Sequence, residues 1–158
     1  MAANIYFADI ILVVTAVVLF YVAVTDLRAY KIRNEIILLL ASLFVLYTLA
    51  SGRWIEAAWS VGLAVVVFGF LLYFYSRGWM GGGDVKILTV ALLWTGIDCA
   101  LVFAILLFVF ASLHALAARF GWLRSQLDDD NNLRIAFAPS VAAALICVFL
   151  LGCLQQSP

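Results

Sequence analysis

Six apolar runs, separated by polar stretches, dominate the pattern of hydrophobic and polar positions along the chain. Unbroken apolar runs are typical of membrane-spanning helices, whereas a transmembrane β-barrel would show alternating segments of about ten residues. A full span takes about 20 residues, so the fourth run is short for a crossing. The runs cover residues 10–25, 36–50, 57–75, 85–97, 99–118 and 135–154.

The distribution of basic residues indicates how many runs cross the membrane. Lys and Arg concentrate in cytoplasmic loops. If all six runs cross, the loops after the first, third and fifth share one side and carry eight of the nine basic residues; if the fourth does not cross, the split becomes five against four. The sequence therefore predicts an all-α polytopic membrane protein, a six-transmembrane-helix bundle over residues 1–158, with both termini extracytoplasmic. The eight are Arg28, Lys31, Arg33, Arg77, Lys86, Arg119, Arg124 and Arg134.

Composition agrees with a lipid-embedded chain. Of 158 residues, 68% are hydrophobic and 11% are charged, against about 25% charged in a soluble domain. The mean hydropathy is +1.18, which excludes intrinsic disorder. No basic face of the kind that binds nucleic acid is present, and no internal repeat suggests an inverted-repeat transporter.

The three cysteines give no sign of a metal site. Cys99, Cys147 and Cys153 form no CxxC pair and have no second type of metal ligand nearby, so we interpret them as small apolar residues within or beside spans. A disulfide between Cys99 and Cys153 is compatible with an outer position of both residues, but no pattern requires it.

Two aspartates flank the apolar runs on the predicted cytoplasmic side. Asp26 directly follows the first run, and Asp84 directly precedes the fourth. Helices from Asp9 to Asp26 and from Asp84 to Asp98 would measure about 25 and 21 Å, while the hydrocarbon core is about 30 Å thick. We therefore expect both carboxylates slightly below the cytoplasmic surface. Because carboxylates are costly there, their matched depth suggests a joint task.

Paired carboxylates in a poorly hydrated site share a proton, because both cannot ionise cheaply. One can then act as general base toward a water while the other polarises a carbonyl. Alternatively, each acid merely borders a helix, with Asp84 as N-cap of the fourth run. Before Asp84 stand Gly81, Gly82 and Gly83, which open backbone conformations closed to other residues and let another chain approach closely.

Together these residues resemble a known family. Gly81-Gly82-Gly83-Asp84 is similar to the signature of the GxGD intramembrane aspartic peptidases, and Val85-Lys86 directly after it also fits the family. Asp26, followed by Ile32-Arg33-Asn34, is similar to the Asp and Ile-Pro-Asn of type IV prepilin peptidases of the short CpaA/TadV type. Ile135-Ala136-Phe137-Ala138-Pro139 is similar to that family's Ile-Pro-Tyr-Gly-Pro stretch.

The resemblance implies a peptidase at the cytoplasmic membrane of a bacterium or archaeon, removing short basic leaders from prepilins or pseudopilins. It implies catalytic Asp26 and Asp84 and no metal or organic cofactor, since the loop after the first run lacks the cysteine-rich insertion of the longer bifunctional enzymes. Arg33, Ala136 and Ala138 depart from the family's proline, proline and glycine. These departures alter loop rigidity and the start of the last helix, not the acid pair.

The other polar residues receive supporting roles. Lys86 either holds a negative charge, contacts the substrate or serves topology. Asn34 either caps the second run, which we favour, or organises the loop with Asp26. His114 is expected to be hydrogen-bonded locally rather than catalytic. Three consecutive acids in the last cytoplasmic loop form either a solvated loop or a contact that attracts a basic leader at a range of about 10 Å. They are Asp128, Asp129 and Asp130.

Two other functions remain open from the sequence. A preflagellin-type peptidase would use the same chemistry on another client. A non-catalytic membrane subunit or small transporter would use the acid pair to bind a cation or proton. In each case the lipid bilayer is a partner, and the sequence leaves the oligomeric state undetermined.

Overall fold

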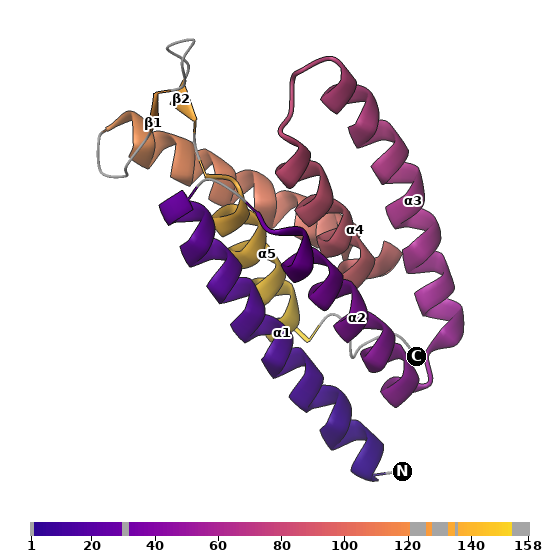
Figure 1. Ribbon diagram of the computed structural model, residues 1–158. Helices are drawn as coiled ribbons and strands as arrows, with labels where there is room; N and C mark the ends of the chain where they lie inside the picture. Colours follow the sequence, from indigo (N-terminus) through magenta and orange to yellow (C-terminus); the bar gives the residue numbers. More distant parts are fainter. Residues whose placement is uncertain (1, 30–31, 121–125, 128–132, 135, 153–158) are drawn as a thin grey trace.

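The computed structural model describes residues 2–29, 32–120, 126–127, 133–134 and 136–152. These residues form an all-helical bundle with one short two-stranded hairpin (Figure 1). The hairpin is antiparallel and pairs Gln126 with Arg134, within a stretch that the sequence suggests is only a polar loop. The elements are α1 (Ala2–Ala29), α2 (Asn34–Ser51), α3 (Trp54–Ser76), α4 (Gly82–Arg119), β1 (Gln126–Leu127), β2 (Leu133–Arg134) and α5 (Ala138–Leu150).

Four helices among the described residues, α1 to α4, are long and apolar enough to cross a membrane, while α5 is a shorter apolar helix. Large apolar side chains cover the outside of the bundle, including Phe20, Phe70 and Phe108, each more than 60% exposed. A soluble protein rarely exposes so much contiguous apolar surface. The chain is therefore a multi-pass membrane protein.

The fourth and fifth predicted runs belong to one element, α4, which breaks at Gly96. Gly96 has φ 63° and ψ −173°, a conformation that is essentially restricted to glycine. The predicted break at Asp98 is therefore wrong by two positions, because Gly96 and not the acid interrupts the helix. In Figure 1 the second half of α4, drawn in orange, leads back toward the hairpin.

The last helix is shorter than the predicted sixth run over residues 135–154. Helix α5 covers Ala138–Leu150, and Pro139 stands in its first turn. Proline is favoured there because it lacks an N–H that the helix would leave unpaired, and its φ is already helical. After the helix, Gly152 adopts a positive φ of 65°. These two residues confine the helix to 13 residues.

The core lies where α5 packs between α1 and α4. Val141, Leu145 and Val148 of α5 are fully buried, and the small residues of the same helix allow close packing in a membrane. The indole N–H of Trp94 in α4 donates to the backbone oxygen of Leu40 in α2 over 3.1 Å. Helix α3 packs chiefly against α4 and makes few contacts with α2.

The helix ends lie at two opposite ends of the bundle. The ends of α1 and α3 and the start of α5 lie toward the end of the bundle that carries the hairpin, whereas the α2–α3 turn lies at the other end (Figure 1). Asp26 lies near the end of α1, and Asp84 lies near the start of α4, which follows the end of α3. Both candidate aspartates therefore belong to the end of the bundle that carries the hairpin. The fold thus brings segments distant in sequence to one end of the bundle.

Candidate active site

Asp26 lies in the last turn of α1 and is only 5% exposed. Its Oδ2 accepts a hydrogen bond of 3.0 Å from the backbone N–H of Ala138, the first residue of α5. The N-cap residue of α5, Phe137, makes no side-chain capping bond. A carboxylate from α1 therefore satisfies a backbone donor that the start of α5 would otherwise leave unpaired, and the positive end of the helix dipole favours its charge.

Asp84 lies in the first turn of α4, as its third residue. The interpretation of Asp84 as N-cap is wrong, because Gly81 occupies that position and makes no side-chain capping bond. The Asp84 carboxylate folds back over Gly81: a Cβ at Gly81 would stand 3.1 Å from Asp84 Oδ2. The side chain is half-buried at a position where the helix dipole favours a negative charge.

The two carboxylates, Asp26 and Asp84, come close enough for a mutual electrostatic interaction. One ends α1 and the other begins α4, so the fold joins positions far apart in sequence. Two like charges that interact in a poorly hydrated site favour a shared proton. The arrangement can therefore supply a general base and a proton donor at one end of the bundle.

The three glycines before Asp84 serve close packing. None of Gly81, Gly82 and Gly83 has a positive φ, so the expectation that they provide unusual backbone conformations is wrong. Within the chain, a Cβ on Gly82 would lie 3.2 Å from the Tyr75 ring, and one on Gly83 would lie 3.5 Å from Ile32. These glycines let Tyr75 at the end of α3 and Ile32 before α2 pack against the start of α4, and the approach of another chain stays a prediction.

Asn34 and Lys86 form a link between two helices beside the acid pair. Lys86 Nζ donates to Asn34 Oδ1 over 2.8 Å, and the bond lies at the exposed surface. The prediction that Asn34 caps α2 is wrong, because Arg33 is the N-cap and lacks a side-chain capping bond. Asn34 instead holds the Lys86 ammonium two positions after Asp84.

His114 lies near Asp26 and contacts Ser140, an arrangement that the sequence did not predict. His114 Nδ1 and Ser140 Oγ share a hydrogen bond of 3.3 Å between α4 and α5, which confirms a hydrogen-bonded histidine. An electrostatic interaction also joins His114 to Asp26. No local motif signals this proximity, because it depends on how α4 returns after Gly96.

The structure describes only some of the remaining residues that the sequence singled out. Asp128, Asp129 and Asp130 lie outside the described residues. Cys99 is disulfide-bonded and Cys147 is free, while Cys153 lies outside the described residues. Within the described ranges, no group of three or more His, Cys, Asp or Glu side chains is arranged to hold a metal ion.

A membrane-embedded helical bundle with two acids meeting at one end defines a candidate intramembrane aspartic hydrolase. The family model of the type IV leader peptidases matches residues 13–155. The chain belongs to this family and is an aspartic-type prepilin peptidase. No curated protein and no solved structure gave a match. Family membership excludes the alternative of a non-catalytic subunit or transporter.

Proposed function

We propose that this chain is a short CpaA/TadV-type prepilin peptidase whose catalytic pair is Asp26 and Asp84. It removes the basic leader peptide from type IV, Flp/Tad-like prepilins or pseudopilins at the cytoplasmic face of the bacterial or archaeal membrane. The observation that carries the proposal is the electrostatic interaction of these two carboxylates, from α1 and α4, at one end of the bundle.

The reaction depends on the shared proton. The ionised carboxylate takes a proton from a water, and the resulting hydroxide attacks the scissile carbonyl carbon. The protonated carboxyl group donates its proton to the carbonyl oxygen. The tetrahedral intermediate then breaks its C–N bond: the nitrogen takes the proton that the first carboxylate removed from the water, and a hydroxyl group of the intermediate returns a proton to the second carboxylate. No acyl-enzyme forms. The backbone N–H of Ala138 fixes the orientation of Asp26, and the link between Asn34 and Lys86 holds α2 against α4 beside Asp84.

The proposed topology has six spans, with both termini extracytoplasmic. A straight helix of the length of α4, 38 residues, would measure about 57 Å, nearly twice the hydrocarbon core of about 30 Å. The break at Gly96 divides it into arms of residues 82–95 and 97–119, and the proposed topology gives each arm one crossing, the first of them short. This topology gathers the basic residues on the side of the acid pair, as the positive-inside rule requires, and leaves Arg53 at the other end.

The leader-binding role of Asp128, Asp129 and Asp130 is part of the proposal. A basic leader next to three acids gains attraction at distances of about 10 Å. Reversing the three charges should raise KM for a basic leader and leave kcat unchanged. An unaltered KM would remove this role without affecting the role of the acid pair.

Co-expression with a candidate prepilin tests the catalytic assignment. The wild-type chain should shorten the substrate by its leader, whereas Asp26→Asn and Asp84→Asn should each leave it uncut. Glu35→Gln is the matched control, because Glu35 is an acid at the same end of the bundle, exposed and paired with Arg33. Substantial cleavage by either Asn variant would overturn the assignment. Comparing a prepilin with a preflagellin in the same assay identifies the client.

A further inference from the structure

A cavity of about 350 Å³ lies away from the acid pair, at the opposite end of the bundle. Its walls come from the end of α2, the start of α3 and the middle of α4 around Gly96. Helices α2 and α3 are both candidate spans joined by two residues, so their turn lies at a membrane–water interface. Trp54 and Trp59 beside this turn are about 60% exposed, as aromatic residues at an interface commonly are.

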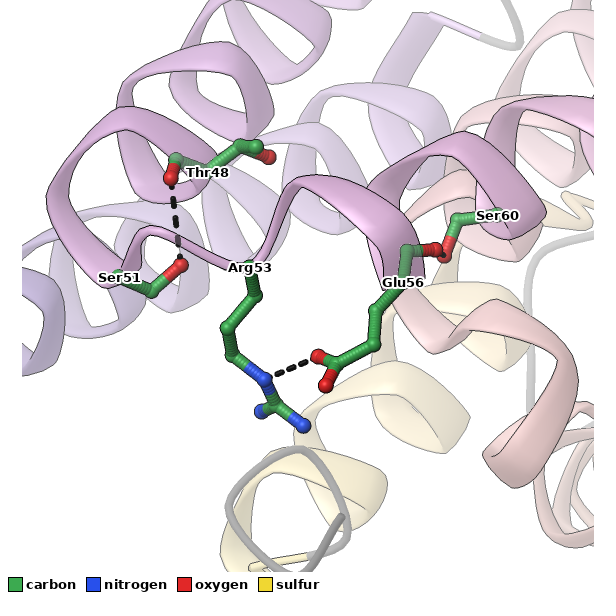
Figure 2. Close-up of polar contacts among 5 residues, drawn as sticks. All are labelled: Thr48, Ser51, Arg53, Glu56 and Ser60. Carbon is green, nitrogen blue, oxygen red and sulfur yellow. Dashed lines mark hydrogen bonds and ion pairs between the residues drawn. The ribbon is translucent and has the colours of Figure 1, made fainter. Parts of the chain in front are cut away.

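Charges of both signs line this cavity. Arg53 and Glu56 form an ion pair (Figure 2), and Asp98 contributes a carboxylate from α4. The Arg53 side chain is 23% exposed and that of Glu56 is 37% exposed, so both sit partly within the protein surface. Arg53 also has a hydrogen bond with Tyr47. The lining thus offers one guanidinium and two carboxylates at a lipid interface.

The hydroxyl groups of the lining are already oriented toward their own helices. Thr48 Oγ1 donates to the backbone oxygen of Phe44 over 3.0 Å, and Ser60 Oγ donates to that of Glu56 over 2.9 Å. Each hydroxyl oxygen therefore keeps acceptor lone pairs for a visiting donor. Hydroxyl acceptors beside two carboxylates favour a ligand group that carries several N–H donors, such as a primary ammonium.

The inner wall of the cavity is aromatic. The rings of Phe44 and Tyr47 each lie 5.6 Å from that of Trp94, measured between centroids. Aromatic faces attract cations and pack against apolar chain segments. Ile97 at the rim is 56% exposed, and the few contacts between α2 and α3 leave their apolar surfaces to lipid. A ligand with a charged head and an apolar tail therefore matches the charged cavity and the apolar helix surfaces beside it.

We propose that this cavity binds the headgroup of a phospholipid carrying a primary ammonium beside its phosphate, as phosphatidylethanolamine does. A guanidinium has five N–H donors, so that of Arg53 can hold a phosphate oxygen in addition to Glu56 and Tyr47. The ammonium donates to Glu56 and Asp98, and the acyl chains extend along α2 and α3. A purely anionic headgroup is disfavoured, because it would face two carboxylates and one guanidinium.

Native mass spectrometry of the detergent-solubilised full chain tests this proposal. The probes are phosphatidylethanolamine, phosphatidylcholine and phosphatidylglycerol of identical acyl chains, each titrated separately. We expect a one-to-one adduct with phosphatidylethanolamine at concentrations about tenfold below those needed for the other two, as loss of one charge-assisted hydrogen bond implies. Equal binding of all three lipids, or preference for phosphatidylglycerol, would overturn it.

Substitutions of residues that line the cavity test whether the lipid binds there. Asp98→Asn and Arg53→Gln should each weaken the phosphatidylethanolamine adduct about tenfold. Arg33→Gln is the matched control, because it breaks an exposed Arg–Glu pair at the other end of the bundle and should leave the adduct unchanged. Asp98 is exposed, so Asp98→Asn keeps the test decisive if Arg53→Gln fails to fold. An adduct that persists in Asp98→Asn contradicts the site.

Discussion

Asp26 at the end of α1 accepts a hydrogen bond from the backbone N–H of Ala138 at the start of α5, across 3.0 Å. This bond closes a loop of 112 sequence positions and fixes one carboxylate of the acid pair. It also gives Asp26 a structural role that can be separated from the chemical one, since accepting this bond requires an oxygen but no negative charge.

Two substitutions at Asp26 should therefore have different consequences. Asp26→Asn keeps an acceptor oxygen, so the free energy of unfolding should stay close to that of the wild type, while cleavage falls at least about a hundredfold because one of the two carboxylates that share the proton is lost. Asp26→Ala should also lower stability by about 0.5–2 kcal/mol, the usual cost of removing a helix cap. Thermal unfolding in detergent, measured beside prepilin cleavage, distinguishes the two effects. Equal destabilisation by both substitutions would contradict the capping role.

Gly81 should tolerate a side chain less well than its glycine neighbour. In Gly81→Ala the new Cβ would meet Asp84 Oδ2 at 3.1 Å, whereas in Gly83→Ala it would meet Ile32 at an ordinary 3.5 Å. Displacing a reacting carboxylate is expensive for catalysis, so Gly81→Ala should reduce kcat about tenfold or more, and by more than Gly83→Ala does. Gly62→Ala, with open space around the new Cβ, is the control. The reverse order of the first two variants would show that the contact with Asp84 is not limiting.

The bond between Lys86 and Asn34 should couple α2 to α4. Lys86→Met and Asn34→Ala, alone and combined, form a double-mutant cycle on the free energy of unfolding. Because the bond lies at the exposed surface, we expect a coupling energy of only about 0.5–1 kcal/mol. Additive single effects would mean that the 2.8 Å bond adds no stability.

The sequence predicts the class of this protein better than it predicts where each helix begins and ends. Apolar runs and charge placement predict a helical membrane protein, and the motifs around Asp26 and Asp84 identify the family, which the match over residues 13–155 confirms. Local patterns carry this information because hydrophobicity and short motifs are properties of neighbouring residues.

The predictions from sequence are wrong where contacts between residues distant in sequence determine the local structure. Asn34 is a favoured capping residue by type, yet its side chain binds Lys86, 52 positions away. The break in α4 falls at Gly96, beside Ser60 of α3, rather than at the more conspicuous Asp98. His114 meets Ser140 only because α4 turns back toward α5. Each outcome depends on packing between helices, which one sequence does not encode locally.

The disulfide at Cys99 offers a stability test that also reports topology. Cys99 lies three residues after the break in α4 and is 1% exposed. Disulfides persist in oxidising compartments, so the proposed topology, with this end of the bundle outside the cytoplasm, predicts that the bond forms in cells. Cys99→Ser should lower the free energy of unfolding by about 2–4 kcal/mol.

Cys147→Ser is the control for this prediction, because Cys147 is a free thiol. Mobility on non-reducing gels, with and without thiol alkylation before lysis, measures whether Cys99 is oxidised. A fully alkylated Cys99 in cells with intact periplasmic disulfide-forming machinery would place the break in α4 on the cytoplasmic side and contradict the six-span topology.

Gly96 should be the glycine least replaceable for folding. Its positive φ and extended ψ are essentially restricted to glycine and cost other residues about 1–3 kcal/mol. A Cβ there would also stand 2.8 Å from Ser60 Oγ, closer than unbonded atoms approach. Gly96→Ala should therefore lower the free energy of unfolding by about 2–3 kcal/mol, measured in detergent. Gly96→Ala with Ser60→Ala should recover only the part due to the clash. Gly69→Ala, with open space around its Cβ, should be neutral or slightly stabilising, and a Gly96→Ala variant as stable as Gly69→Ala would show that the break in α4 does not require glycine.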